Sequence, residues 1–352
     1  MRILIDILHP AHVHFFRNFH AEMSKRGHQL RITARAKECS IELLERYGLP
    51  YELISVQRSG QLGLAAELMQ RTYRLAQVIR AFRPTVITGI MGPSIALAGK
   101  IHRVPAVVFY DTEFAAQTNW FVYPLAYSVC TPDCYEGEVR GTHRTYAGYH
   151  ELAYLHPNRF APDPGKLEAF GLNPGEPYSI VRFVSWQAIH DRREGGLTVE
   201  QKRELVRLLE QHGRVLISSE GPLPDDLQDK KVGGPIQDIH HLLAFAQLIV
   251  GESATMASEA GVLGVPAVFI AKTGRGYIND QERRYGLVRH FTEDRFAEAV
   301  ETVTGLLRGM LPADLRTRAR EQLLSEKIDV TEWMVSYFEQ QFSAGWQRGI
   351  GG

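Results

Sequence analysis

The chain has 352 residues with 40 basic and 40 acidic side chains, so its formal net charge at pH 7 is zero. This balance argues against a nucleic-acid-binding protein and against a polybasic membrane anchor. The length corresponds to about two domains. A composition of 44% hydrophobic and 23% charged residues is typical of a soluble globular protein. Three cysteines are too few for a disulfide framework.

The first residues lack a signal-peptide pattern, because Asp6 interrupts the short apolar run that follows Arg2. No apolar stretch in the sequence is long enough to span a bilayer. We therefore expect a cytoplasmic protein without a transmembrane segment. The sequence is compatible with peripheral contact with a membrane.

Apolar runs alternate with helical patterns through the first half of the chain. The predicted strands cover residues 2–7, 28–34, 51–55, 85–89, 106–110, 128–131 and 145–147. The predicted helices cover residues 13–26, 41–47 and 64–82, with further helices opening at 92–94 and after 113. Because strand alternates repeatedly with helix, we predict a doubly wound parallel sheet.

Residues 149–177 carry five prolines and few apolar runs, which indicates an interdomain linker. Beyond it we predict strands at 178–186, 215–219, 248–250 and 267–270, and helices at 199–212, 238–245, 254–264, 296–307, 313–324 and 330–342. The fold class is therefore α/β, with two tandem Rossmann-like halves at residues 1–160 and 161–352. The last helix is free to cross back to the first half. Ligands of such sheets bind beyond the carboxyl ends of the strands, so we expect the halves to face a cleft.

The stretch LIVGESATMASEAGVLGVPAVFI, from residue 248 to 270, carries the clearest functional pattern. A strand ends at Gly251, and the following helix begins at Ser253, Ala254 and Thr255. The free N–H groups and the dipole of such a helix start favour a phosphate. Glu259 lies about one turn further on the same face and could accept hydrogen bonds from a ribose diol. In the alternative interpretation this is an ordinary βαβ unit, in which Ser253 caps the helix and Glu259 is a solvated charge.

Polar residues also follow the predicted strands of the first half. His12 lies between the first strand and its helix, where a neutral imidazole could take a proton from an acceptor hydroxyl. His9 competes for this role, and either imidazole could instead cap the helix. Asp111 and Glu113 end a buried strand, and they could act as catalytic carboxylates or cap the next helix.

In the second half, Arg182 lies inside an apolar strand, where it needs an anionic partner such as a phosphate or an internal carboxylate. Ser185, Ser219 and Arg275 follow other strands of this half and are further candidates for binding the substrate. The loop 272–277 is basic and rich in glycine but lacks the Walker pattern, which disfavours ATP hydrolysis. The sequence shows no GxGxxG after the first strand, no GxSxG and no zinc or EF-hand spacing, so we expect no dinucleotide, hydrolase or metal site.

Three stretches resemble one family. They are MRILIDILHPAHVHFF at the N-terminus, DTEFA from Asp111 and RGYINDQERRYGLV from Arg275, which are similar to domain of unknown function 354. The two tandem halves resemble the GT-B fold of nucleotide-sugar enzymes. The second half carries the motifs of this resemblance, namely Ser-x-Thr, Glu and Leu-Gly-Val-Pro. Residues 12–28 and 84–113 resemble the N-acetylglucosaminyltransferase of peptidoglycan assembly. The second of these regions is also similar to the non-hydrolysing UDP-N-acetylglucosamine 2-epimerases, in which a carboxylate after this strand is catalytic.

The resemblance implies a nucleotide in the second half, with Ser253–Thr255 at the phosphates, Glu259 at the ribose and Ile236 beside the base. It implies an acceptor against the first half, near His12 and the pair Gly92 and Pro93. Two departures limit the analogy. His-Pro-Ala-His at residues 9–12 replaces a glycine-rich loop, so a lipid-diphosphate acceptor is not implied. The tandem glycines of the epimerase phosphate motif are absent.

The leading hypothesis is a glycosyltransferase that binds a nucleotide-diphospho-sugar in the cleft and transfers the sugar to a glycan, lipid-linked or small-molecule acceptor. It needs no cofactor or essential metal, because a helix start with Arg or Lys would stabilise the leaving diphosphate. One alternative is a sugar-nucleotide epimerase in which Asp111 or Glu113 removes a carbon-bound proton. Another is a non-catalytic nucleotide-sugar-binding module.

Overall fold

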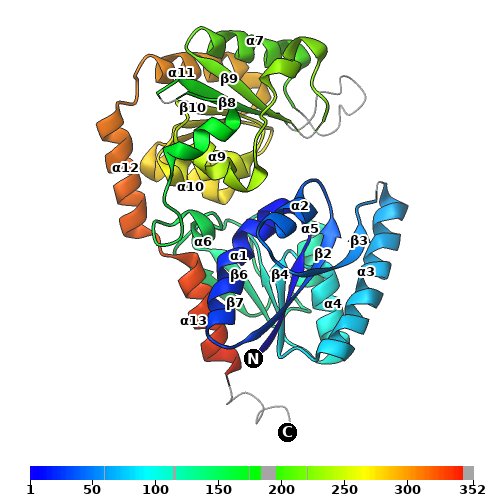
Figure 1. Ribbon diagram of the computed structural model, residues 1–352. Helices are drawn as coiled ribbons and strands as arrows, with labels where there is room; N and C mark the ends of the chain where they lie inside the picture. Colours follow the sequence, from blue (N-terminus) through cyan, green and yellow to red (C-terminus); the bar gives the residue numbers. More distant parts are fainter. Residues whose placement is uncertain (59, 114–115, 174, 184–195, 220, 344–352) are drawn as a thin grey trace. The chain divides into compact units, whose positions relative to one another are not determined.

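The computed structural model describes residues 1–58, 60–113, 116–173, 175–183, 196–219 and 221–343. These residues divide into two compact units, each built on its own parallel sheet. The first unit contains Met1–Arg159 and the segment from Ile328 onward, and the second contains Phe160–Lys327. Figure 1 shows both units with their elements labelled.

The first unit has a seven-stranded sheet of order β3-β2-β1-β4-β5-β6-β7 in which every pairing is parallel. Its strands are β1 (Arg2–Ile7), β2 (Gln29–Ala36), β3 (Tyr51–Val56), β4 (Val86–Ile90), β5 (Ala106–Phe109), β6 (Ser128–Pro132) and β7 (His143–Tyr146). Its helices are α1 (Pro10–Lys25), α2 (Ser40–Arg46), α3 (Gln61–Phe82), α4 (Pro93–His102), α5 (Ala116–Val122), α6 (Leu152–Leu155) and α13 (Val330–Phe342). Helices α1, α2, α4 and α5 each connect a strand to its parallel neighbour, whereas a loop connects β6 to β7. This architecture confirms the predicted doubly wound sheet.

The strand order of the first unit reverses between β1 and β4. The chain leaves β1 toward β2 on one side and returns through α3 to β4 on the other. Accordingly, α1 packs with α2, α6 and α13, whereas α4 packs with α3 and α5. The helices thus form separate layers on the two faces of the sheet, and the loops after β1 and β4 diverge at its carboxyl edge.

The second unit has a five-stranded parallel sheet of order β12-β11-β10-β8-β9. Its strands are β8 (Tyr178–Phe183), β9 (Arg214–Ser219), β10 (Leu248–Gly251), β11 (Ala267–Ile270) and β12 (Val288–Phe291). Its α-helices are α7 (Val199–Glu210), α8 (Ile239–Ala244), α9 (Ala254–Leu263), α10 (Gly276–Tyr285), α11 (Phe296–Leu307) and α12 (Ala313–Glu326). Short 3₁₀ turns lie at Pro164–Phe170, Asp225–Lys230, Ile236–Asp238 and Glu293–Arg295. The strand order reverses between β8 and β10.

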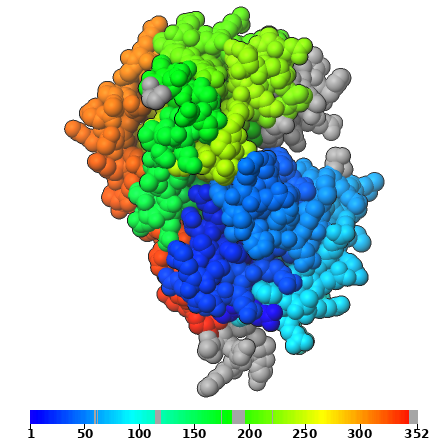
Figure 2. Space-filling model, viewed as in Figure 1, coloured from blue at the N-terminus to red at the C-terminus, as the bar shows by residue number. Residues whose placement is uncertain are grey.

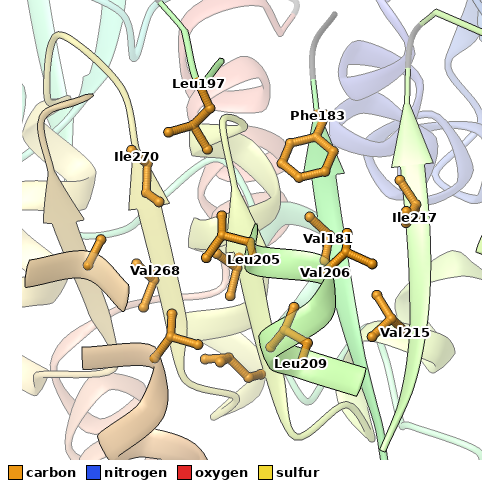
Figure 3. Packing of buried hydrophobic residues seen from close by; sticks show 14 of the residues in the cluster. Val181, Phe183, Leu197, Leu205, Val206, Leu209, Val215, Ile217, Val268 and Ile270 are labelled. Carbon is orange, nitrogen blue, oxygen red and sulfur yellow. The ribbon is translucent and has the colours of Figure 1, made fainter. Parts of the chain in front are cut away.

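An apolar layer holds α7 on this sheet. Figure 3 shows Leu205, Val206 and Leu209 of α7 among the buried side chains of the sheet. These three residues fall at helical spacing on one face and are at most 1% exposed. The helix begins with a capping box, in which Thr198 and Gln201 each accept a hydrogen bond from the backbone N–H of the other. The position of α7 therefore follows from both its local start signal and its apolar stripe.

The structure differs from the sequence expectation at several element boundaries. The first helix begins at Pro10, three residues before the predicted start, because His9 serves as its N-cap and proline is favoured in the first helical turn. Helix α10 and strand β12 were not predicted. Helix α10 is polar in sequence. Because its buried face includes Asp280 and Gln281, apolar residues do not recur at helical spacing. Residues 149–177 are not a plain linker, because α6 is fully buried in the first unit.

We predict that Leu205→Ala lowers the free energy of unfolding by about 2–5 kcal/mol, because the substitution leaves a cavity between α7 and the sheet. Urea unfolding followed by circular dichroism measures this change. Leu315→Ala on α12 is the control, since Leu315 is exposed and its truncation should cost less than about 0.5 kcal/mol. Equal losses in the two variants would contradict the packing described for α7.

Candidate functional site

A pocket of about 470 Å³ opens in the first unit where the loops after β1 and β4 diverge. It brings together three of the predicted residues, His9, His12 and Pro93. The other lining residues are Leu8, Arg35, Lys37, Leu64, Glu67, Leu68, Arg71, Ile90, Met91 and Ser94. The lining therefore combines apolar side chains with basic and hydrogen-bonding groups, as in a site for a small organic ligand.

Gly92 is the N-cap residue of α4 and lies directly between two pocket residues. Its φ of 33° is in the left-handed region, and a Cβ at this position would lie 2.4 Å from the side chain of Ile95. The tight turn allows Pro93 to start α4 immediately after β4. Gly92 thus contributes to the pocket by its backbone conformation, which positions the neighbouring residues Met91 and Pro93.

His12 is held in one tautomer by the turn that precedes α1. Its Nδ1 accepts a hydrogen bond from the Leu8 backbone N–H at 3.2 Å. Because a neutral imidazole carries a single N–H, the proton of neutral His12 lies on Nε2. Burial lowers the pKa of His12 well below its ordinary value, and the nearby His9 lowers it further, although Asp111 acts in the opposite direction. His12 is therefore a neutral hydrogen-bond donor at physiological pH.

Asp111 follows β5 and forms a pair with His150, a residue that the sequence did not single out. His150 Nδ1 lies 3.0 Å from Asp111 Oδ2. Burial alone would raise the Asp111 pKa, but His150, a hydrogen bond from Thr112 and the nearby His12 outweigh burial, so the pKa lies below its ordinary value. Asp111 is therefore an ionised carboxylate with a fixed orientation.

The ring of His150 is buried beside two aromatic rings. The ring centroid lies 4.5 Å from that of Phe15 on α1 and 6.4 Å from that of Tyr146 on β7. Its Nε2 is buried without a hydrogen-bond partner in the described part of the chain. The contact of Nδ1 with Asp111 therefore fixes the orientation of the ring. His150 lies just before α6, within residues 149–177, which the prolines of this segment led us to predict as a linker.

Glu113 stands apart from this pair. Its Oε1 accepts a hydrogen bond from the Glu136 backbone N–H at 3.3 Å. Its carbonyl accepts a bond from Asn119 Nδ2 at 3.4 Å. These contacts tie Glu113 to α5 and to the loop after β6, so the two predicted carboxylates have different neighbours.

The predicted phosphate turn of the second unit lies between β10 and α9. Gly251 has φ 150°, and a Cβ there would lie 2.0 Å from the carbonyl oxygen of Arg182, its register partner on β8. Ser253 is the N-cap of α9, and its Oγ accepts a bond from Met256 N–H at 3.3 Å. The N–H groups of Ala254 and Thr255, in the first turn, lie at the carboxyl edge of the sheet.

The other predicted residues of the second unit occupy two neighbourhoods. Arg182 donates from Nη1 to Ser218 Oγ at 3.0 Å, and Ser219 Oγ is buried beside it without a partner among the described residues. Arg275 is the N-cap of α10 and binds Thr273 and the Gly274 carbonyl. Ile236 begins the short 3₁₀ turn before α8. Ser185 lies outside the described residues.

Glu259 is buried on α9 and meets a second residue that the sequence did not indicate. His240 Nε2 on α8 lies 3.0 Å from Glu259 Oε1. Another buried pair, Lys202 with Glu252 at 3.2 Å, stands beside the phosphate turn. Lys202 neutralises the carboxylate that would otherwise repel an anion at the start of α9. Neither His240 nor Lys202 carries a sequence signal, because both meet their partners only through packing of separate helices.

Residues 1–152 match the family model described as "Protein of unknown function (DUF354)". This confirms the resemblance predicted from the N-terminal motifs. No curated protein sequence matches the chain.

Solved structures share the two-sheet architecture over almost the whole chain. UDP-GlcNAc 2-epimerase from Neisseria meningitidis, bound to UDP-GlcNAc, has a TM-score of 0.69 at 12% identity and covers 97% of this chain and 100% of its own. MurG of Acinetobacter baumannii has a TM-score of 0.59 at 14% identity with the same coverage. The spinosyn forosaminyltransferase SpnP has a TM-score of 0.60 at 14% identity and covers 97% and 98%. The fold is therefore GT-B-like, as predicted, and at these identities the likeness concerns the fold alone.

None of the helices described is both long enough and apolar enough to cross a membrane. Within the same residues, no group of three or more His, Cys, Asp or Glu side chains is arranged to hold a metal ion.

We predict that His12 makes stability depend on pH. The unfolded chain protonates His12 near its ordinary value of 6.5, whereas the folded pKa is well below it. The unfolded state therefore binds more protons below pH 6.5, and stability falls as pH drops, by at most about 1.4 kcal/mol per pH unit. His12→Asn keeps an acceptor for Leu8 N–H and should reduce this slope in urea titrations at several pH values. Identical slopes in both proteins would contradict the buried neutral state.

Proposed function

We propose that the chain is a GT-B glycosyltransferase that binds a nucleotide-diphospho-sugar on its second unit and an acceptor in the pocket of its first unit. The observation that carries the proposal is the turn at Gly251, which presents the start of α9 at the carboxyl edge of a parallel sheet. A helix start of this kind stabilises a diphosphate through its N–H groups and its dipole. The similar fold of an epimerase bound to UDP-GlcNAc supports a nucleotide sugar as the ligand.

In this proposal the charges around the turn complement a diphosphate. Arg182 lies opposite Gly251 on β8 and supplies a cation at the same edge of the sheet. Lys202 already neutralises Glu252, so the only carboxylate in the turn does not oppose the ligand. Glu259 would bind the ribose hydroxyls, with its carboxylate oriented by His240. Stabilisation of the leaving diphosphate by these groups requires no metal ion.

The geometry of the first unit favours Asp111 over His12 as the base that deprotonates the acceptor. His12 has Nδ1 engaged with Leu8 N–H, so its neutral form offers a proton instead of accepting one. Asp111 is ionised and oriented by His150. We therefore assign the proton acceptor to Asp111 and a hydrogen-bond donor to a substrate oxygen to His12.

A sugar-nucleotide epimerase is the second candidate, and the TM-score of 0.69 with an epimerase favours it. Asp111 would then remove a carbon-bound proton from the sugar. The pocket of about 470 Å³ in the first unit favours transfer, because an epimerase needs no site for a separate acceptor. Incubation with the best-binding sugar nucleotide in deuterated water separates the candidates. Deuterium at a sugar carbon indicates epimerisation, whereas slow release of unlabelled sugar indicates a transferase.

We predict that a nucleotide diphosphate or its sugar conjugate raises the melting temperature by about 4 °C at about 100 times its dissociation constant. A thermal-shift panel of UDP, GDP, dTDP and their sugar conjugates measures this. Glu259→Gln should lose most of the shift while keeping the melting temperature of the free protein close to that of wild type. Glu298→Gln on the exposed part of α11 is the matched control. If none of these compounds changed the melting temperature, the proposed nucleotide site would be rejected.

We predict that Asp111→Asn lowers kcat by about 10²–10⁴-fold and leaves the nucleotide-induced thermal shift unchanged, because the substitution removes only the base. His12→Asn retains a donor and should cost less. Steady-state turnover of the best-binding sugar nucleotide measures both. If His12→Asn abolished turnover while Asp111→Asn retained it, His12 would be the base instead.

A further inference from the structure

The outer side of α3 carries an apolar stripe that the fold does not use. Leu62, Ala65, Ala66, Met69 and Tyr73 follow one another at helical spacing, and all are exposed. Leu62 is 88% exposed, Met69 75% and Tyr73 66%. Figure 1 shows α3 in light blue along the β3 edge of the sheet, and the same helix is visible at the surface in Figure 2. We call these five residues the α3 stripe.

The α3 stripe is not needed to hold the helix in place. The inner face of α3 already packs into the core through Leu75, Val78 and Ile79. The buried ion pair of Arg71 with Asp6, and a second pair between Arg35 and the buried Glu67, join the same helix to the sheet. The helix is therefore apolar on two sides, and only one of them is buried. Soluble proteins rarely expose large contiguous apolar surface unless it contacts a partner or a membrane.

The exposed charges of the segment that contains the α3 stripe are mostly positive. Four arginines between residues 51 and 83 are exposed, namely Arg58, Arg74, Arg80 and Arg83. Glu52 is the one exposed carboxylate in this segment, since Glu67 is buried in its pair with Arg35. The stripe thus lies within a locally cationic surface on a chain whose net charge is zero.

We propose that the α3 stripe lies on the surface of an anionic lipid membrane. Helices with an apolar face flanked by arginine insert that face at the boundary between headgroups and acyl chains, while the guanidinium groups bind lipid phosphates. A tyrosine such as Tyr73 suits the same boundary. A second copy of the chain is disfavoured, because a two-fold contact through this face would bring the arginines of both copies together.

The proposed membrane contact adjoins the pocket of the first unit. Leu64 and Leu68 of α3, one turn apart, line that pocket. The helix that would lie on the lipid therefore also forms one wall of the pocket, on its opposite side. The inference does not depend on the proposed sugar transfer, since lipid binding is measured without any nucleotide.

Sedimentation of the 352-residue protein with vesicles tests the proposal. We expect binding to vesicles of phosphatidylcholine with phosphatidylglycerol, and at least tenfold weaker binding to phosphatidylcholine alone or at high salt, because each arginine near an anionic surface contributes about fivefold. Binding of equal strength to both vesicles at all salt concentrations would overturn the electrostatic part of the proposal. Absence of binding to either vesicle would overturn it entirely.

Variants locate the contact. The double change Met69→Glu and Tyr73→Glu should abolish sedimentation with anionic vesicles, whereas Met310→Glu, at an exposed position of the second unit, should not change it. Circular dichroism verifies the fold of each. Arg74→Gln with Arg80→Gln, which leaves the stripe intact, should weaken binding by about tenfold or more. If the variant with Met69→Glu and Tyr73→Glu bound vesicles as strongly as the wild type, the α3 stripe would not be the membrane contact. The proposal would also be rejected if analytical ultracentrifugation showed a dimer that the same double change dissociates.

Discussion

The close approach of two strands at Gly251 is the constraint on which the proposed nucleotide site depends. The backbone of β10 passes so near to the carbonyl of Arg182 that only glycine fits. At this point the chain leaves the sheet and starts α9, so the first-turn amides of the helix lie at the carboxyl edge. Arg182, Ser218 and the pair of Lys202 with Glu252 surround the same edge. One steric requirement thus places the amides and the cations together.

A second set of buried polar contacts organises the first unit. Arg71 of α3 donates to both carboxylate oxygens of Asp6 on β1, at 2.7 and 2.8 Å, and to Ser55 on β3. Buried ion pairs of this kind specify position more than they add stability, because their desolvation offsets much of the attraction. The pair fixes α3 against the sheet. The helix then forms one wall of the pocket with its inner side and presents the α3 stripe on its outer side.

The histidines of the first unit show how the same side chain takes different roles in different surroundings. His9 caps α1 by accepting a bond from Ala11 N–H. His12, three residues later, is buried and accepts from Leu8 N–H, which sets its tautomer. His150 donates to Asp111 from a cage of aromatic rings. Their backbone settings and burial, and not their residue type, determine which atom of each ring is available.

The sequence by itself determined the two parallel sheets and most of their elements, because strand and helix periodicities, glycine stops and the proline at Pro93 are local signals. It also identified His9, His12 and Pro93, which the structure brings to one pocket, since loops after parallel strands meet at one edge. Tertiary structure alone decided the partners of these residues. His150, His240 and Lys202 meet Asp111, Glu259 and Glu252 across distances of 39, 19 and 50 positions in the chain, and local sequence patterns carry no record of such contacts. The tautomer of His12 and the exposure of the α3 stripe likewise depend on which surfaces pack together, and a helical period shows that a face is apolar without showing whether it is covered.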